Sequence, residues 1–98
     1  MFKATKEQIA EWKAKYGDVF CIKIEDKACC YLKKPDRKIL GYAGQASQAN
    51  PLKFNEVILY QCWIDGDEEI KTNDDLFLAA APKVLLLNEV YKSDLEKL

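Results

Sequence analysis

The sequence predicts an α+β protein with an N-terminal helix, a two-stranded antiparallel β-hairpin and then three to four helices. Apolar residues alternate over much of residues 18–33, as they do in strands, and recur at helical spacing over most of residues 36–98. The 98 residues are 49% hydrophobic and 32% charged, and they contain no repeat and no long linker. We therefore expect a single domain over residues 1–98.

The first helix begins at a capping box. Thr5 stands at the N-cap and Gln8 at the N3 position, where their side chains can bond the free backbone N–H groups of the first turn. Apolar residues follow at helical spacing as far as Tyr16, and Gly17 is suited to end the helix. Trp12, within this helix, is expected to pack in the core.

The hairpin is predicted from two runs of alternating residues on either side of a polar turn. Residues 19–24 and 28–33 are rich in β-branched, aromatic and cysteine side chains, and residues 25–27 are charged. The turn has neither Asn-Gly nor Asp-Gly, so its register stays open by one residue. Because the register is open, the sequence does not decide which cysteines of the two strands face the core.

A short helix is predicted over residues 36–47. Pro35 is expected at its first position, where a missing N–H is tolerated. Gly41 and Gly44 weaken the helix and suggest that another element packs closely against it.

Two further helices follow. Asn50 and Pro51 form a start signal for a helix over residues 52–64, which is apolar on most of its circumference and should be central. An acidic break precedes the last helical region, which begins near Asp74 and runs to residue 98. Pro82 is expected to kink or divide it.

Composition and charge argue against several classes of protein. Fifteen basic and sixteen acidic residues give a net charge of -1, which provides no general attraction to nucleic acid or to an anionic membrane. The apolar stretch over residues 76–82 is too short to span a membrane. The N-terminus has no apolar signal-peptide region, so we expect a cytosolic protein.

No catalytic or metal site is predicted. The chain has no histidine, which removes the commonest general base and zinc ligand. Cys21, Cys29, Cys30 and Cys62 lack zinc-finger spacing, and in the cytosol they should be reduced and buried. We expect no enzyme activity and no cofactor.

An acidic loop at Asp65, Asp67 and Glu69 has the alternation that opens a calcium-binding loop. The twelfth position, however, holds Leu76 where the calcium loop requires Glu. The loop is therefore expected to be solvated.

The last helical region carries more apolar residues than one packing face needs. One stripe at helical spacing is sufficient for the core: Leu76, Ala80, Val84, Leu87, Tyr91, Leu95 and Leu98. Leu78, Leu85, Leu86 and Val90 lie outside this stripe and are the candidate partner-binding residues. Either they form a surface for self-association or for a partner helix, or the helix is enclosed within its own domain.

Two passages carry a resemblance to a known group. The hairpin followed by YLKKPDRKIL at residues 31–40 resembles small tail assembly chaperones of long-tailed bacteriophages. The pattern FNEVILYQCW at residues 54–63, then Gly66-Asp67 and DDLFLAA at residues 74–80, resembles phage and prophage proteins of Bacteroides-type genomes. The resemblance covers residues 5–98, although Pro82 interrupts a helix that should be continuous.

The resemblance implies a non-enzymatic assembly factor in the cytoplasm of a bacterial host. Such a chaperone holds a long helical tape-measure protein while the tail tube polymerises around it, which requires apolar helix faces. The alternative is a small structural component of the virion, such as a neck, connector or capsid accessory protein. Presence in finished particles distinguishes the two classes.

Overall fold

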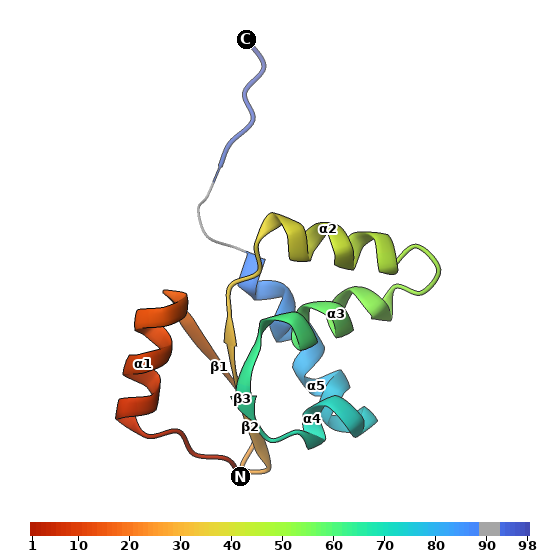
Figure 1. Cartoon of the computed structure of the whole chain (residues 1–98). Helices are drawn as coiled ribbons and strands as arrows, with labels where there is room; N and C mark the ends of the chain where they lie inside the picture. The colour runs from red at the N-terminus through yellow and green to blue at the C-terminus, as the bar shows by residue number, and fades with distance from the viewer. Residues whose placement is uncertain (89–92) are drawn as a thin grey trace.

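The computed structural model describes residues 1–88 and 93–98. Its elements follow one another in this order (Figure 1): α1 (Lys6–Tyr16), β1 (Val19–Ile24), β2 (Ala28–Lys33), α2 (Arg37–Ala46), α3 (Leu52–Cys62), β3 (Trp63–Gly66), α4 (Glu69–Thr72), α5 (Asp74–Val84) and the 3-10 helix η1 (Leu85–Asn88). The predicted α+β class, with an N-terminal helix, a hairpin and several helices, is confirmed.

The strands form one antiparallel sheet in the order β1-β2-β3. The hairpin register that the sequence left open is set by the pairing of Ile24 with Ala28. Figure 1 shows the sheet between two layers, with α1 on one side and α2 to α5 on the other. Because side chains alternate along a strand, Ala28, Cys30 and Leu32 share the face toward the larger helical layer.

Helix α1 begins at the predicted capping box. The Thr5 hydroxyl oxygen accepts from the N–H of Gln8 at 3.1 Å, and the Gln8 side-chain oxygen accepts from the N–H of Thr5 at 2.9 Å. No residue of α1 is fully buried. Trp12 is half-buried and packs on Tyr31 of β2, with 5.2 Å between ring centroids. Trp12 therefore anchors α1 to the outer sheet face and does not reach the core.

Helix α2 starts one residue later than the sequence indicated. Asp36 is its N-cap, and the Asp36 carboxylate accepts from the N–H of Ile39 at 2.8 Å. Pro35 therefore precedes the helix. The close packing expected at Gly41 and Gly44 was wrong, because a Cβ atom at either position meets no other atom within 4 Å.

Helix α3 is central, as predicted. It begins where the Asn50 side chain accepts from the N–H of Leu52 at 3.1 Å, and Ile58, Leu59 and Cys62 have no exposed surface. The helix ends at Cys62, where the sequence predicted helix through residue 64. The backbone of Trp63 turns extended, and β3 follows without a loop.

The C-terminal region departs most from the prediction. The Asn73 side chain caps α5, accepting from the N–H of Leu76 at 3.1 Å. Pro82 lies inside α5, which ends at Val84, and η1 follows. Residues 93–98 have no helical structure. The prediction of helix through residue 98 was therefore wrong, and residues 89–92 lie outside the described part of the chain.

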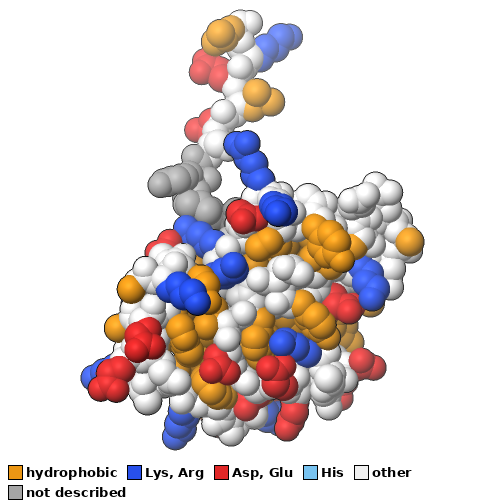
Figure 2. Space-filling view, in the orientation of Figure 1, with side chains coloured by type: hydrophobic (Ala, Val, Ile, Leu, Met, Phe, Trp, Pro, Cys, Tyr) orange, Lys and Arg blue, Asp and Glu red, His pale blue; other side chains and the backbone are white. Residues whose placement is uncertain are grey.

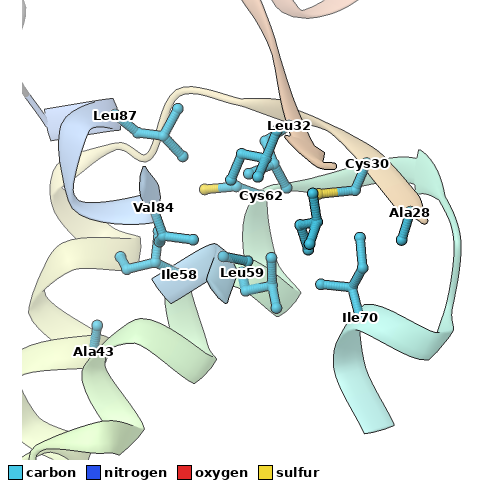
Figure 3. Close-up of a cluster of buried hydrophobic side chains, with 13 residues drawn as sticks. Ala28, Cys30, Leu32, Ala43, Ile58, Leu59, Cys62, Ile70, Val84 and Leu87 are labelled. Carbon is cyan, nitrogen blue, oxygen red and sulfur yellow. The ribbon is translucent and has the colours of Figure 1, made fainter. Parts of the chain in front are cut away.

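The core is one apolar cluster between the sheet and the larger helical layer. Leu32 of β2, Ile58 of α3 and Ile70 of α4 are among its largest fully buried side chains. Figure 3 shows Cys30 and Cys62 with their sulfur atoms among aliphatic side chains. The predicted core stripe of the last helical region is present over Leu76 to Leu87, whereas Leu95 and Leu98 are fully exposed and Tyr91 lies outside the described residues.

Candidate protein-binding surface

The four partner-binding residues predicted from the sequence do not form one surface. Leu78, Leu85 and Leu86 are exposed, with 53%, 44% and 54% of their surface accessible. Val90 lies outside the described residues. Leu78 lines a groove against α3, whereas Leu86 lines a separate groove against β1. The structure therefore divides the predicted site between two places.

The first place is the α3–α5 groove, a hollow of about 460 Å³. Its apolar wall consists of Leu52 at the start of α3 and of Phe77 and Leu78 on α5. Leu52 and Leu78 are each more than half exposed, and Phe77 is half-buried against the core. Four charged side chains complete the groove: Lys53, Glu56, Lys71 and Asp74.

Shallower hollows continue from this groove toward α2. A neighbouring hollow of about 380 Å³ shares Lys53 and Glu56 with the α3–α5 groove and is lined by Tyr42 and Tyr60. Both tyrosines are exposed. Figure 2 shows apolar side chains over the α2 and α3 side of the molecule, with basic and acidic side chains between them. Exposed aromatic and aliphatic groups framed by charges are typical of protein-binding surfaces.

The charges around the α3–α5 groove are held by local contacts. Lys53 and Glu56 approach to 3.4 Å, and Lys71 and Glu68 approach to 3.0 Å. The Lys71 ammonium also lies 4.2 Å from the centroid of the Trp63 ring, within cation–π range. Since these cations are already paired, the groove offers a partner apolar contacts more than a net charge.

The second place is the β1–α5 groove, a hollow of about 310 Å³ beside the end strand of the sheet. Phe20 and Ile22 of β1 face Leu86 and Leu87 of η1 across it. Leu87 is buried, and Phe20 and Leu86 are exposed. Cys21 and two lysines on different elements, Lys23 and Lys83, complete its lining.

Burial opposes thiolate chemistry at three of the four cysteines. Removal from water raises the pKa of the Cys30 thiol to about 12 and that of the Cys62 thiol to about 11, and it also raises the pKa of Cys29. All four cysteines are free, as expected. Cys21 is exposed, however, because β1 turns it to the outer face near the end of the sheet.

The acidic loop is not simply solvated. The Asp67 carboxylate accepts from the N–H of Phe2 at 2.9 and 3.0 Å and from the N–H of Cys29 at 2.9 Å. These hydrogen bonds hold the pKa of Asp67 below its usual value. The Cys29 thiol in turn donates to the Phe2 carbonyl oxygen at 3.0 Å. Sequence spacing could not reveal this contact, because the two partners of Asp67 are remote in the chain.

Comparison with protein-family models, with curated proteins and with solved structures found no significant match. Over residues 1–88 and 93–98, the cysteine and acidic side chains form no group of three that could hold a metal ion. In the same residues, no helix has the length and apolar character to cross a membrane.

Proposed function

We propose that this protein is a non-enzymatic assembly factor of the phage tail chaperone type. It binds an amphipathic helix of a tape-measure-type partner in the cytoplasm of a bacterial host, and its α3–α5 groove receives that helix. The observation that carries the proposal is the pair Leu52 and Leu78, which come from two different helices, line one groove and are each more than half exposed.

The groove has the features that helix-in-groove recognition requires. An amphipathic helix presents apolar side chains three and four residues apart, and these fill an apolar trough while its polar face stays in water. Phe77 provides a floor that the core holds in place. Lys53, Glu56 and Asp74 lie at the polar positions where the charged flank of such a helix meets the rim.

Exposed apolar surface of this kind suits a protein that masks aggregation-prone helices. A chaperone covers the partner's hydrophobic stripe with a stripe of its own and needs surrounding charges to stay soluble. The resemblance of residues 31–40 and 54–80 to phage proteins supports the choice of a tape-measure-type partner.

Affinity purification of the tagged protein from phage-producing cells tests the proposal, with mass spectrometry of the co-purifying proteins and of finished particles. We expect the wild type to recover a long helical protein and to be absent from particles. Leu78→Glu and Leu52→Glu should each reduce recovery at least about tenfold, since a charge is placed in an apolar contact. Leu86→Glu, in the other groove, is the matched control and should retain recovery.

Two results would contradict the proposal. Equal recovery with Leu78→Glu and with wild type would exclude the α3–α5 groove as the binding site. Stoichiometric presence of the protein in finished particles would identify a structural component of the virion, because an assembly chaperone leaves before completion.

A further inference from the structure

The described C-terminal segment, residues 93–98, carries apolar side chains that are not covered by any other described residue. Leu95 and Leu98 are fully exposed. Figure 1 shows this segment standing away from the domain, and Figure 2 shows apolar and charged side chains together on it. Leucine side chains in water are an unfavourable arrangement that association relieves.

The same chain contains an apolar groove with no occupant from these residues. Phe20 and Leu86 are exposed in the β1–α5 groove, and Ile22 and Leu87 are buried beneath them. Its volume of about 310 Å³ is of the size that receives one or two apolar side chains. This groove is distinct from the α3–α5 groove of the proposed function, with which it shares no lining residue.

The charges of the β1–α5 groove favour residues 93–98 as the segment that binds there. Lys23 and Lys83 line the groove, and neither forms an ion pair with another described residue. Residues 93–98 place Asp94 and Glu96 on either side of Leu95, and their one cation, Lys97, stands next to Leu98. An apolar side chain between two carboxylates is complementary to an apolar groove lined by two ammonium groups.

We propose that residues 93–98 of one copy bind in the β1–α5 groove of a second copy, with Leu95 and Leu98 on Leu86 and Phe20 and with Asp94 and Glu96 near Lys23 and Lys83. Both surfaces occur once in every chain, so two copies exchange their segments reciprocally. Exchange of one identical element between two protomers gives a closed two-fold dimer and requires no binding surface other than the segment and the groove. The occupant is a second copy, since Figure 1 shows residues 93–98 standing away from the domain of their own chain.

Charge reversal in two complementary variants tests this exchange by sedimentation velocity. The first variant carries Lys23→Glu and Lys83→Glu, and the second carries Asp94→Lys and Glu96→Lys. Like charges then face each other in each homodimer, so each variant alone should dimerise at least about tenfold more weakly than wild type. In an equimolar mixture every segment again meets a groove of opposite charge, and the dimer should return.

The equimolar mixture of the two variants distinguishes reciprocal exchange from binding of the segment within its own chain and from a dimer interface elsewhere. If the segment instead folded onto its own groove, wild type would be a monomer at every concentration and mixing would restore nothing, which would overturn the proposal. Dimers that persist in both single variants would also overturn it. Leu86→Glu and the pair Leu95→Ser and Leu98→Ser should abolish the dimer, whereas Leu78→Glu should keep it. Loss of the dimer in Leu78→Glu alone would move the interface to the α3–α5 groove.

Substituted residues in this test are exposed, and the far-ultraviolet circular dichroism of each variant confirms that it is folded. The neutral pair Lys23→Gln and Lys83→Gln is a milder version, for which we expect an intermediate dissociation constant. Raising the salt concentration should weaken the wild-type dimer and should affect this neutral variant less, because salt screens exposed charge pairs. Equal salt dependence of the two proteins would contradict the assigned role of the lysines.

Discussion

Asp67 and Cys29 are joined twice. The carboxylate of Asp67 accepts from the backbone N–H of Cys29, and the N–H of Asp67 donates to the Cys29 carbonyl oxygen, each at 2.9 Å. The same carboxylate also accepts a hydrogen bond from the N–H of Phe2. One aspartate therefore ties the end of β3 to the start of β2 and fastens the N-terminal residues over the outer face of the sheet.

Asp67→Asn should lower the free energy of unfolding at pH 7 by about 1 kcal/mol, because the charged acceptor of these hydrogen bonds is lost. The folded state lowers the pKa of Asp67 below 3.8. Its stabilising effect is therefore present above the unfolded-state pKa near 3.8 and is lost as the pH falls through the lower folded-state pKa. Urea unfolding between pH 7 and pH 2 measures this, and Asp67→Asn should show a smaller loss of stability on acidification.

Asp26→Asn is the matched control, since Asp26 is exposed in the hairpin turn. We expect it to retain the wild-type acid profile. An identical profile for Asp67→Asn would show that the hydrogen bonds to Phe2 and Cys29 contribute nothing to stability.

Gly66→Ala should destabilise the fold by at least about 2 kcal/mol. Gly66 has φ 153°, and an added Cβ would lie 2.6 Å from the Cα of Cys30 and 2.7 Å from the Cys29 carbonyl oxygen, both backbone atoms. Gly41→Ala, in the interior of α2 with free space around it, should instead stabilise by about 0.5–1 kcal/mol. Thermal unfolding of the two variants should therefore give shifts of opposite sign; a stable Gly66→Ala would refute the close approach of β3 to β2.

Native-state alkylation should distinguish the four cysteines. At pH 7.5 we expect iodoacetamide to modify Cys21, which is exposed, and to leave Cys30 and Cys62 unmodified, because burial raises their pKa values to about 12 and about 11. Peptide mass spectrometry identifies the modified sites. In denaturant all four should react. Rapid modification of Cys30 in the folded protein would be inconsistent with the core shown in Figure 3.

Adjacent leucines of η1 should respond differently to substitution. Leu87 is 4% exposed and Leu86 is 54% exposed. Leu87→Ala should cost about 2–4 kcal/mol through loss of buried contacts, whereas Leu86→Glu should change the stability of the monomer by no more than about 0.5 kcal/mol and leave the circular dichroism intact. Chemical unfolding at low protein concentration measures both. Unfolding of Leu86→Glu would place Leu86 in the core and remove it from the β1–α5 groove.

Local signals predicted most of the fold. The capping box at Thr5, the alternation of β1 and β2, and the helix start signal at Asn50 are each confined to a few neighbouring residues, and each precedes or forms the predicted element. Strand β3 was missed because its four residues follow α3 directly and have no periodicity of their own. Pairing with β2, remote in the chain, defines this strand.

The candidate site was only partly predictable. Helical spacing identified Leu78 and Leu86 as surplus to the core, and both are exposed. Grouping them assumed one helix to residue 98. The tighter winding of η1 after Val84 breaks that spacing. Residues 93–98 are exposed, and short helices are marginal in water without packing against another surface.

The position of β3 has a consequence for synthesis of the chain. Strands β1 and β2 leave the ribosome one after the other, but β3, which pairs with the second edge of β2, ends at Gly66 and emerges only after the whole of α2 and α3. During that interval the nascent chain displays an unpaired strand edge rich in apolar side chains, the kind of surface on which neighbouring chains aggregate. Because of this strand order, residues Trp63–Gly66, which are synthesised late, cover the free edge of β2, which is synthesised early.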